Sequence, residues 1–473
     1  MAAPGPSTHQ TKLEGYDFFR KVLGSPKYVV APMVDQSELA WRRLSRKYGA
    51  QLIYTPMINA RMFAQDQRKS YRPEMFDLGS GEEGGLGDRP LIVQFAANDL
   101  DWLLKAAKMV EARCDAVDIN LGCPQDIARR GHYGSYLQDE WDLIYKMINN
   151  LHKNLSIPVT AKFRVFPTIE KTVEYAKMLE SAGAQILTCH GRTREQRGHN
   201  TGLADWEKIR AVKEAVSVPV IANGNILFHS DIEACLAATG ADAVMSAEGN
   251  LYNPVVFMSA PASSSSLADP ALPSTWCISS DGLHLPHTHL ALEYLAIVKS
   301  QKTRTKGSAV KGHLFKLLRP ALGRETDLRD RLGRIQIKRL GDSEAWDQYE
   351  ALIKEFDERM QRDARAAEGR PVDKLITVHE STGLKMMPHW VAQPYFRAMP
   401  KVVEQAEKNE ETAESVVAEG GEPQCASADV DIPPYGSAAG KRAPSERTPE
   451  LDELAKRVKL VREDAAEPLA AAS

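Results

Sequence analysis

The stretch AVDINLGCPQDIARRGHYGSY, residues 116–136, decides how this chain of 473 residues is interpreted. It begins as an apolar run with two β-branched residues, which predicts a short buried strand. The strand ends at Asn120, because Pro124 cannot extend it and Gly122 allows backbone angles that a side chain would forbid. Cys123 is therefore predicted to lie just past the carboxyl end of a strand.

Two interpretations of Cys123 are open on this stretch alone. In a β/α barrel, catalytic groups lie at the carboxyl ends of the strands, and the basic Arg129, Arg130 and His132 follow the thiol closely. The alternative is a small buried hydrophobic residue, which is what most free cysteines are.

The sequence around this stretch alternates regularly between strand and helix patterns. Eight strands with helices between them over residues 28–257 favour a (β/α)8 TIM barrel, an α/β fold, over an open doubly wound sheet. The open sheet is disfavoured because no GxGxxG fingerprint follows the first strand. The predicted strands are Tyr28–Ala31, Gln51–Thr55, Leu91–Phe95, Ala116–Asn120, Val159–Arg164, Ile186–His190, Val218–Asn223 and Ala243–Ala247. The predicted helices are Glu38–Lys47, Leu100–Arg113, Asp139–Leu151, Ile169–Ala182, Asp205–Ala215 and Ser230–Ala238.

Outside the barrel the sequence divides into four segments. We expect residues 1–27 to be a mobile leader with one short amphipathic turn, and residues 258–288 to be an irregular insert rich in Ser and Pro. Helical patterns at His289–Gln301, Ser308–Arg319, Thr326–Arg334 and Ser343–Ala367 predict an all-helical domain over residues 289–400, with residues 388–397 packed back on the folded body. Residues 401–473 are acidic and poor in aromatic residues, which predicts a disordered tail.

Composition restricts the class of protein. Hydrophobic residues make up 43% and charged residues 26%, as in soluble globular proteins, and no apolar run approaches the roughly 20 residues of a membrane span. The six cysteines form no CxxC pair, which argues against a zinc site or disulfide framework and for a reducing compartment. Because the first residues do not resemble a secretory signal, we expect an intracellular protein. The basic clusters at 441–442 and 456–459 leave the cytoplasm and the nucleus open, since such runs are also common as solvated charge.

The net charge of −3 hides a division along the chain. Residues 293–340 hold 13 Lys and Arg against 4 Asp and Glu, whereas residues 401–473 hold 9 against 16. The basic segment predicts a phosphate-binding stripe, and an ordinary solvated helix surface is the alternative. The residues of the predicted stripe are Lys302, Arg304, Lys306, Lys311, Lys316, Arg319 and Arg324.

Polar side chains and glycines cluster at the predicted carboxyl ends of the strands. Polar residues there are costly unless they bind a ligand. Amides suit the edge of a planar heterocycle, a Lys and a His supply cationic or donor groups, and glycine turns before helices suit a phosphate. Together they fit flavin mononucleotide (FMN). The ring consists of Pro32-Met33-Val34, Thr55-Pro56, Gln94, Asn120 with Cys123, Lys162 with Arg164, His190 with Arg192, Asn223-Gly224-Asn225 and Glu248-Gly249-Asn250.

These motifs resemble the tRNA-dihydrouridine synthases, and most closely the eukaryotic branch that reduces uridines 16 and 17 in the D-loop. The resemblance is carried by NLGCPQDIARRGHYGSYL together with APMV, VQF, AKFR, HGRTREQ, NGNI and MSAEGNLYNP. It is strong over residues 28–257 and weak over 289–400. That family has an FMN-binding barrel followed by a helical domain that holds tRNA.

The resemblance implies a role for each matching position. NADPH or NADH would reduce FMN, reduced FMN would deliver hydride to C6 of uridine, and Cys123 would donate the proton to C5. Asn120, Arg164 and Arg192 would contact the substrate base, and Lys311, Lys316 and Arg319 would contact tRNA phosphates. The residues implied to line the flavin are Pro32, Met33, Val34, Gln94, Lys162, His190, Asn223, Gly224, Asn225, Ala247, Glu248 and Gly249.

Two departures from the family pattern affect these expectations. Glu248 stands where many relatives carry Arg, in a turn expected to meet the FMN phosphate, so we expect the backbone N–H groups of Gly249 and Asn250 to bind it. The second departure is the insert at 258–288. Two other functions remain as alternatives, an FMN-dependent oxidoreductase of a small molecule and a non-catalytic tRNA-binding protein. We expect a monomer without a membrane or metal partner.

Overall fold

The computed structural model describes residues 12–67, 69–198, 201–259, 278–279, 281–339, 342–380 and 382–396. The predicted tail at 401–473, its two basic clusters, residues 1–11 and most of the 258–288 insert lie outside the described residues. In the described part of the chain, no helix is long and apolar enough to span a bilayer.

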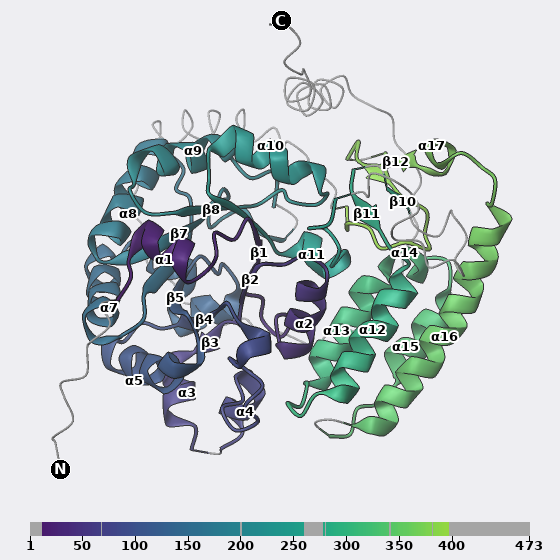
Figure 1. Ribbon diagram of the computed structural model, residues 1–473, viewed down its shortest axis with the longest axis horizontal. Coiled ribbons are helices and arrows are strands. Elements are labelled where there is room, and N and C mark those ends of the chain that lie inside the picture. Colours follow the sequence, from purple (N-terminus) through teal and green to yellow (C-terminus); the bar gives the residue numbers. More distant parts are fainter. Residues whose placement is uncertain are drawn as a thin grey trace, which may run out of the picture. The chain divides into compact units, whose positions relative to one another are not determined.

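Eight parallel strands close into a barrel, as the sequence predicts (Figure 1). The sheet order is β2-β1-β9-β8-β7-β6-β5-β4, and a pairing of β2 with β4 closes the ring, while the short β3 joins the end of β4. The strands are β1 Tyr28–Val30, β2 Leu52–Tyr54, β3 Ile58–Asn59, β4 Leu91–Ala96, β5 Ala116–Leu121, β6 Val159–Arg164, β7 Ala184–His190, β8 Val220–Asn223 and β9 Ala243–Ser246.

The helices of the barrel lie outside the strands, and the six predicted ones are present. They are α2 Leu39–Lys47, α5 Leu100–Val110, α7 Trp141–Asn154, α8 Ile169–Ser181, α9 Trp206–Ala215 and α10 Ser230–Thr239. Short helices that the sequence did not predict are also present: α3 Ala60–Gln65, α4 Tyr71–Met75, α6 Asp126–Gly131 and α11 Glu248–Tyr252, with 3-10 turns at Leu86–Asp88 and Gly134–Leu137. The last residues of the predicted helix Leu100–Arg113 form a 3-10 turn, Glu111–Arg113.

The interior of the barrel is layered from apolar to polar. Side chains alternate between the two faces of a strand, so every second residue of each strand points into the barrel. In the lower half these positions are apolar and buried: Val29, Leu52, Ile92, Ala116, Ile186, Ile221 and Ala243. Most inward-facing positions nearer the carboxyl ends are polar, whereas Ala31 and Met245 are apolar. The polar ones are Gln94, Asp118, Asn120, Thr160, Lys162, Thr188, His190 and Asn223. The pattern therefore leaves one end of the barrel suited to a polar ligand.

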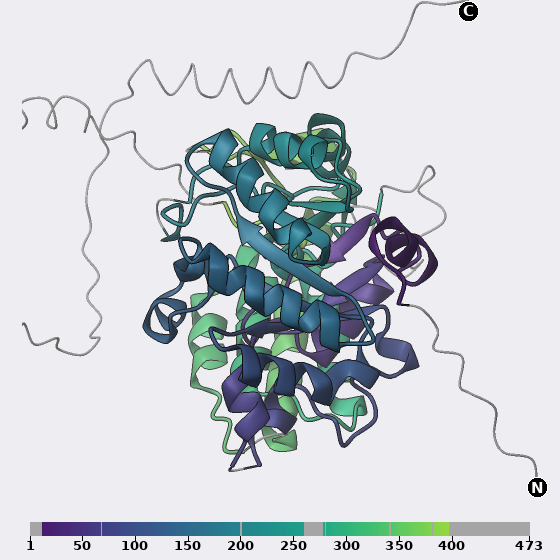
Figure 2. The same cartoon turned by 90° about the vertical axis from the view of Figure 1, so that its left-hand side faces the viewer.

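Residues 12–27 differ from the expected mobile leader. Gly15–Lys21 forms helix α1, seen as the purple helix at the barrel's edge in Figure 2. Phe18, Phe19 and Leu23 are buried in the same cluster as the apolar interior of the barrel. Tyr16 Oη donates to Asp242 Oδ1 over 3.0 Å, just before β9. The helix thus closes the amino-terminal end of the barrel, because those apolar interior side chains need a cover.

A second group of helices packs against the barrel through α2 (Figure 1). Its core includes Trp41 and Leu44 of α2, and the indole of Trp41 stacks on the imidazole of His313 with ring centroids 4.0 Å apart. Glu38 accepts from Tyr294 Oη (2.7 Å) and lies 3.0 Å from His313 Nε2. The helices are α12 His287–Ser300, α13 Gly307–Leu317, α14 Arg319–Leu322, α15 Thr326–Arg334, α16 Ser343–Ala366 and α17 Val372–Leu375.

Two short hairpins and a returning segment complete the described chain. Strands β10 Ile278–Ser279 and β11 Leu283–His284 pair within the span expected to be an irregular insert, so that expectation is wrong for its last residues. Strands β12 Thr377–Val378 and β13 Lys385–Met386 form the other hairpin. The expected return of residues 388–397 is confirmed as far as residue 396, because Trp390, Val391 and Ala392 are buried in the helical core.

Candidate active site

The residues predicted to form a ring lie at the carboxyl end of the barrel, and many of them contact each other. Lys162 Nζ on β6 donates to Asn223 Oδ1 on β8 over 2.8 Å, across the barrel interior. Asn120 Nδ2 on β5 donates to Gln94 Oε1 on β4 over 2.8 Å. The structure therefore brings the predicted amides and the lysine together in one polar layer.

Cys123 lies in a tightly held turn after β5. Its backbone N–H donates to Asn120 Oδ1 over 2.9 Å, and its carbonyl accepts from the N–H and the hydroxyl of Ser135 at 3.1 and 3.0 Å. The side chain is partly exposed, and burial raises the pKa of the thiol. The thiol is therefore protonated at neutral pH and can give up a proton rather than act as a thiolate.

Arg164, which was expected to contact the uracil, joins two loops at the mouth of the barrel. Its Nε donates to the carbonyl of Gly122 (2.8 Å), and its Nη1 donates to the carbonyls of Thr193 (2.8 Å) and Gln196 (3.1 Å). Burial, followed by the charge of Arg192, lowers the pKa of Arg164 to about 10. In this structure the guanidinium ties the Cys123 turn to the loop after β7.

Lys162 is a partly buried cation in the polar layer. Burial, followed by the nearby charge of Arg164, lowers its pKa to about 8. In the described residues its ammonium donates to the neutral amide of Asn223, and the carboxylate whose charge acts on it is that of Asp118. The ammonium therefore suits an anionic or electron-rich ligand in the mouth.

His190 and Arg192 act as a pair after β7. Burial, with the surrounding positive charges, lowers the pKa of His190 well below its usual value, so the imidazole is neutral. Arg192 Nη1 lies 3.1 Å from His190 Nε2. Because a guanidinium can only donate, Nε2 accepts and the proton of His190 is on Nδ1. His190 is thus a neutral donor here, and the positive charge expected of it belongs to Arg192.

The turns after β8 and β9 each hold a glycine that is closely surrounded by neighbouring loops. Gly224 has φ +119°, and a Cβ there would stand 2.6 Å from Ala204 Cβ. A Cβ on Gly249 would stand 2.2 Å from the carbonyl oxygen of Ile226. Both glycines are therefore required by close approach of neighbouring loops.

The remaining residues predicted around the phosphate turn have partners within the protein. Asn225 Oδ1 accepts from Arg192 Nη2 over 2.8 Å. The N–H of Asn250 donates to Ser246 Oγ over 3.1 Å, so the phosphate contact expected from it is replaced by a bond inside the turn. Glu248 begins α11 after Ala247, and its negative charge acts on Lys316 of the helical domain.

The turn after β1 brings the last predicted residues to the mouth. Met33 N donates to Ser37 Oγ over 3.0 Å, which fixes the turn that follows Pro32. The side chain of Val34 is 40% exposed.

Asp118 is a buried carboxylate in the polar layer that the sequence argument did not single out. It accepts from Gln94 Nε2 (2.8 Å) and Thr160 Oγ1 (2.6 Å), and burial raises its pKa to about 6. A charged residue inside an otherwise apolar strand was the signal that could have identified it.

The comparison with known proteins agrees with this geometry. The sequence profile of the dihydrouridine synthase (Dus) family matches residues 29–338. The chain belongs to the dihydrouridine synthase family. The match covers the barrel of this Dus protein and its helices α12–α15.

Curated relatives of this Dus protein align over most of the chain. The tRNA-dihydrouridine(16/17) synthase [NAD(P)(+)] of Saccharomyces cerevisiae is 46% identical over 82% of this chain and 87% of its own length. The Mus musculus protein tRNA-dihydrouridine(16/17) synthase [NAD(P)(+)]-like is 45% identical over 82% of this chain and 72% of its own length. The Homo sapiens protein tRNA-dihydrouridine(20a/20b) synthase [NAD(P)+]-like is 39% identical over 48% of this chain and 70% of its own length.

The basic residues of the helical domain are engaged with the Dus protein itself. Lys311 Nζ donates to the carbonyl of Gly333 over 2.7 Å, at the end of α15. Lys316 Nζ donates to Gln36 Oε1 over 2.8 Å, and burial lowers its pKa. The guanidinium of Arg319 stacks on Tyr395, 4.7 Å from the ring centroid. These three residues therefore do not form one continuous basic stripe.

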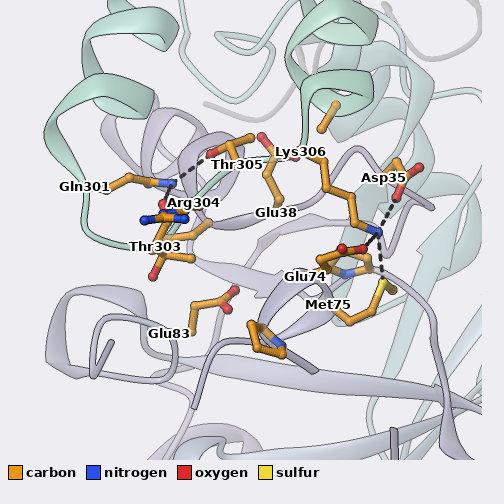
Figure 3. A pocket seen from close by; sticks show the side chains of 14 residues that line it. Asp35, Glu38, Glu74, Met75, Glu83, Gln301, Thr303, Arg304, Thr305 and Lys306 are labelled. Atoms are coloured by element: carbon orange, nitrogen blue, oxygen red, sulfur yellow. Dashed lines mark hydrogen bonds and ion pairs between the residues drawn. The ribbon is translucent and has the colours of Figure 1, made fainter. Parts of the chain in front are cut away.

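Lys306 lines a narrow crevice beside α2 (Figure 3). Its ammonium lies 3.6 Å from Asp35 and 3.5 Å from Glu74, at the junction between barrel and helices. Lys306 is thus neutralised inside the protein rather than aligned with the other cations. In the part of the chain described by the structure, no group of three or more His, Cys, Asp or Glu side chains is arranged to hold a metal ion.

Proposed function

We propose that this protein reduces uridine to 5,6-dihydrouridine in the D-loop of tRNA, at positions 16 and 17. The observation that carries the proposal is the protonated thiol of Cys123, held in a tight turn beside a polar barrel mouth. Similarity to tRNA-dihydrouridine(16/17) synthases over 82% of this chain supports the substrate and the positions, because the 20a/20b relative aligns over only 48% of the chain.

FMN fits the residues of the mouth. Lys162 is a partly buried ammonium that points into the polar layer, where it donates to Asn223. The close-packed turns at Gly224 and Gly249 bring backbone to the mouth, where this fold commonly holds a phosphate. When bound and reduced by NADPH or NADH, FMN supplies a hydride to C6 of the uracil.

The residues of the chain have complementary tasks in this reaction. Cys123 gives its proton to C5 of the uracil, as a general acid whose raised pKa keeps it protonated. Lys162 and Asn120 stabilise the negative charge that develops on the uracil carbonyl, in the manner of an oxyanion site. Because the base must leave its stack to reach the mouth, an unpaired loop is the favourable target.

Reduction of a small molecule and non-catalytic tRNA binding are the competing functions. Absorption spectra separate these functions. They are recorded without oxygen on the purified protein alone, then after addition of NADPH, and then after addition of unmodified tRNA. We expect flavin bands that bleach with NADPH and return with tRNA. Bands that bleach but ignore tRNA would indicate a small-molecule oxidoreductase. A folded protein that binds tRNA but takes up no FMN would contradict the enzymatic proposal.

The helical domain is proposed to contact tRNA phosphates through Lys311, Lys316 and Arg319, as separate contacts rather than as one continuous stripe. Changing each to Gln is expected to lower the slope of log affinity against log salt by about one for each phosphate that the variant no longer neutralises. Filter binding of tRNA at several salt concentrations measures this slope. Lys354→Gln is the control, because Lys354 is an exposed lysine paired with Glu350 on α16. An unchanged slope in any of the three variants removes that residue from the interface.

A further inference from the structure

Three buried side chains stand at one level of the barrel, directly below the Cys123 turn. The strand register pairs Gln94 with Asp118 and Asp118 with Thr160, on β4, β5 and β6. All three residues are fully buried. The carboxylate of Asp118 accepts on both oxygens, from Gln94 Nε2 at 2.8 Å and from Thr160 Oγ1 at 2.6 Å.

Asn120 connects this level to the turn. Its Nδ2 donates to Gln94 Oε1 over 2.8 Å, and its Oδ1 accepts from the backbone N–H groups of Gly122 (3.2 Å) and Cys123 (2.9 Å). One continuous chain of hydrogen bonds therefore runs from Asp118 through two amides to the backbone of Cys123.

The direction of this chain is determined at its upper end. Backbone N–H groups only donate, so Asn120 must turn its oxygen toward them and its NH2 toward Gln94. Gln94 then presents its oxygen to Asn120 and its NH2 downward, into the buried interior. A buried NH2 needs an acceptor, and Asp118 is the group that supplies it.

We propose that Asp118 is a positioning residue, whose carboxylate fixes the amides of Gln94 and Asn120 and through them holds the Cys123 turn at the barrel mouth. The part of this inference that concerns catalysis rests on the proposed function. The hydrogen-bond chain belongs to the protein itself and can be tested without substrate. The charged or titratable groups that act on Asp118 are Lys162 of β6 and Tyr54 of β2.

Amide hydrogen exchange in the full-length protein, followed by mass spectrometry of peptides that contain Gly122 and Cys123, tests the chain of bonds. Asp118→Ala removes the acceptor, and we expect the protection of these two amides to fall about 10-fold, which corresponds to one lost buried hydrogen bond. Asp118→Asn should restore most of the protection, because its carbonyl can still accept from Gln94 while its NH2 faces Thr160. Thr160→Val is the matched control, since it removes the other bond to Asp118 and leaves the path to Cys123 intact.

The outcomes separate a positioning role from a merely structural one. The proposal is supported if Asp118→Ala loses amide protection only in the Cys123 turn and Asp118→Asn restores it. Unchanged protection in Asp118→Ala overturns it, and so does a loss spread evenly over the barrel strands. If Asp118→Ala does not fold, Gln94→Met breaks the middle of the chain, and intact protection of the same two amides would overturn the inference.

Single-turnover kinetics test the catalytic part. In Asp118→Ala the return of flavin bands on addition of tRNA should slow about 10-fold more than their bleaching by NADPH, because only the tRNA step uses Cys123. Equal slowing of both steps overturns the positioning role in catalysis. If no variant and no wild-type protein forms dihydrouridine while the amides respond as expected, the proposed function fails and the hydrogen-bond role of Asp118 stands.

Discussion

Replacing Cys123 by Ala is expected to slow the reduction of uridine in tRNA by roughly 10²–10⁴-fold, the usual contribution of a general acid. The thiol is the group at the mouth whose pKa burial keeps high, so that it carries a proton at neutral pH. In the proposed reaction, hydride transfer to C6 would leave negative charge at C5, and without Cys123 the proton would have to come from water. The bleaching of flavin by NADPH should be unchanged, because it needs no proton from Cys123.

Stopped-flow absorbance with NADPH and then with tRNA measures the two steps separately. Cys235→Ala is the matched control, since Cys235 is a buried thiol of α10, away from the strand ends. Cys123→Ser should also be slow, because a hydroxyl is a much weaker acid than a thiol. A wild-type rate of the tRNA step in Cys123→Ala would remove the residue from catalysis.

The barrel was predictable because its signals are local. Each strand is a short apolar run between helix patterns, and all eight predicted strands are present in the closed sheet. The polar ring followed from the same pattern, since residues at the carboxyl ends of parallel strands meet at one end of the barrel. Lys162 and Asn223 illustrate this, because they are 61 positions apart in sequence and share a hydrogen bond.

What the sequence did not predict depends on contacts between distant segments. Asp118 is one residue in an apolar strand, and its role emerges only when the register places Gln94 and Thr160 beside it. Several of the basic residues between Lys302 and Arg324 were predicted to share one face, but spacing does not say what each helix face contacts. Lys306 and Lys316 turn toward the barrel instead. The amphipathic turn that became helix α1 was predicted, but its burial was not, because the need to cover the barrel's lower end is a property of the closed sheet.

The loop GSGEEGGLGD, residues 79–88, is another segment whose contacts could not be predicted from composition. Its composition resembles that of a solvated linker, but two of its carboxylates are buried. Glu83 and Asp88 both bind Arg42 of α2, whose side chain is fully buried. Arg42 Nε and Nη2 reach the two oxygens of Asp88 at 2.8 and 2.6 Å, and Nη2 reaches Glu83 at 3.0 Å. Nη1 donates to the carbonyl of Ser37, which belongs to the turn after β1.

Arg42→Met is therefore expected to lower the free energy of unfolding by about 3–5 kcal/mol, because it leaves two buried carboxylates without their counter-ion. Burial raises the pKa of Glu83 to about 7 even with the arginine in place and with the backbone N–H of Asp77 donating to it, so its ionised form is costly to bury. Urea unfolding followed by tryptophan fluorescence measures the change. Arg43→Met is the control, since its pair with Glu82 is partly exposed and should contribute only about 0–1 kcal/mol.

Neutralising the two unpaired carboxylates tests whether they cause the loss of stability in Arg42→Met. In the Arg42→Met background, Glu83→Gln with Asp88→Asn should recover part of the stability, because neutral amides are less costly to bury than unpaired carboxylates. A loss in Arg42→Met no larger than in Arg43→Met would show that the buried triad is not what holds the loop to α2. Since Arg42 also binds the carbonyl of Ser37, the single variant should loosen the turn after β1 and so link the stability of this loop to the barrel mouth.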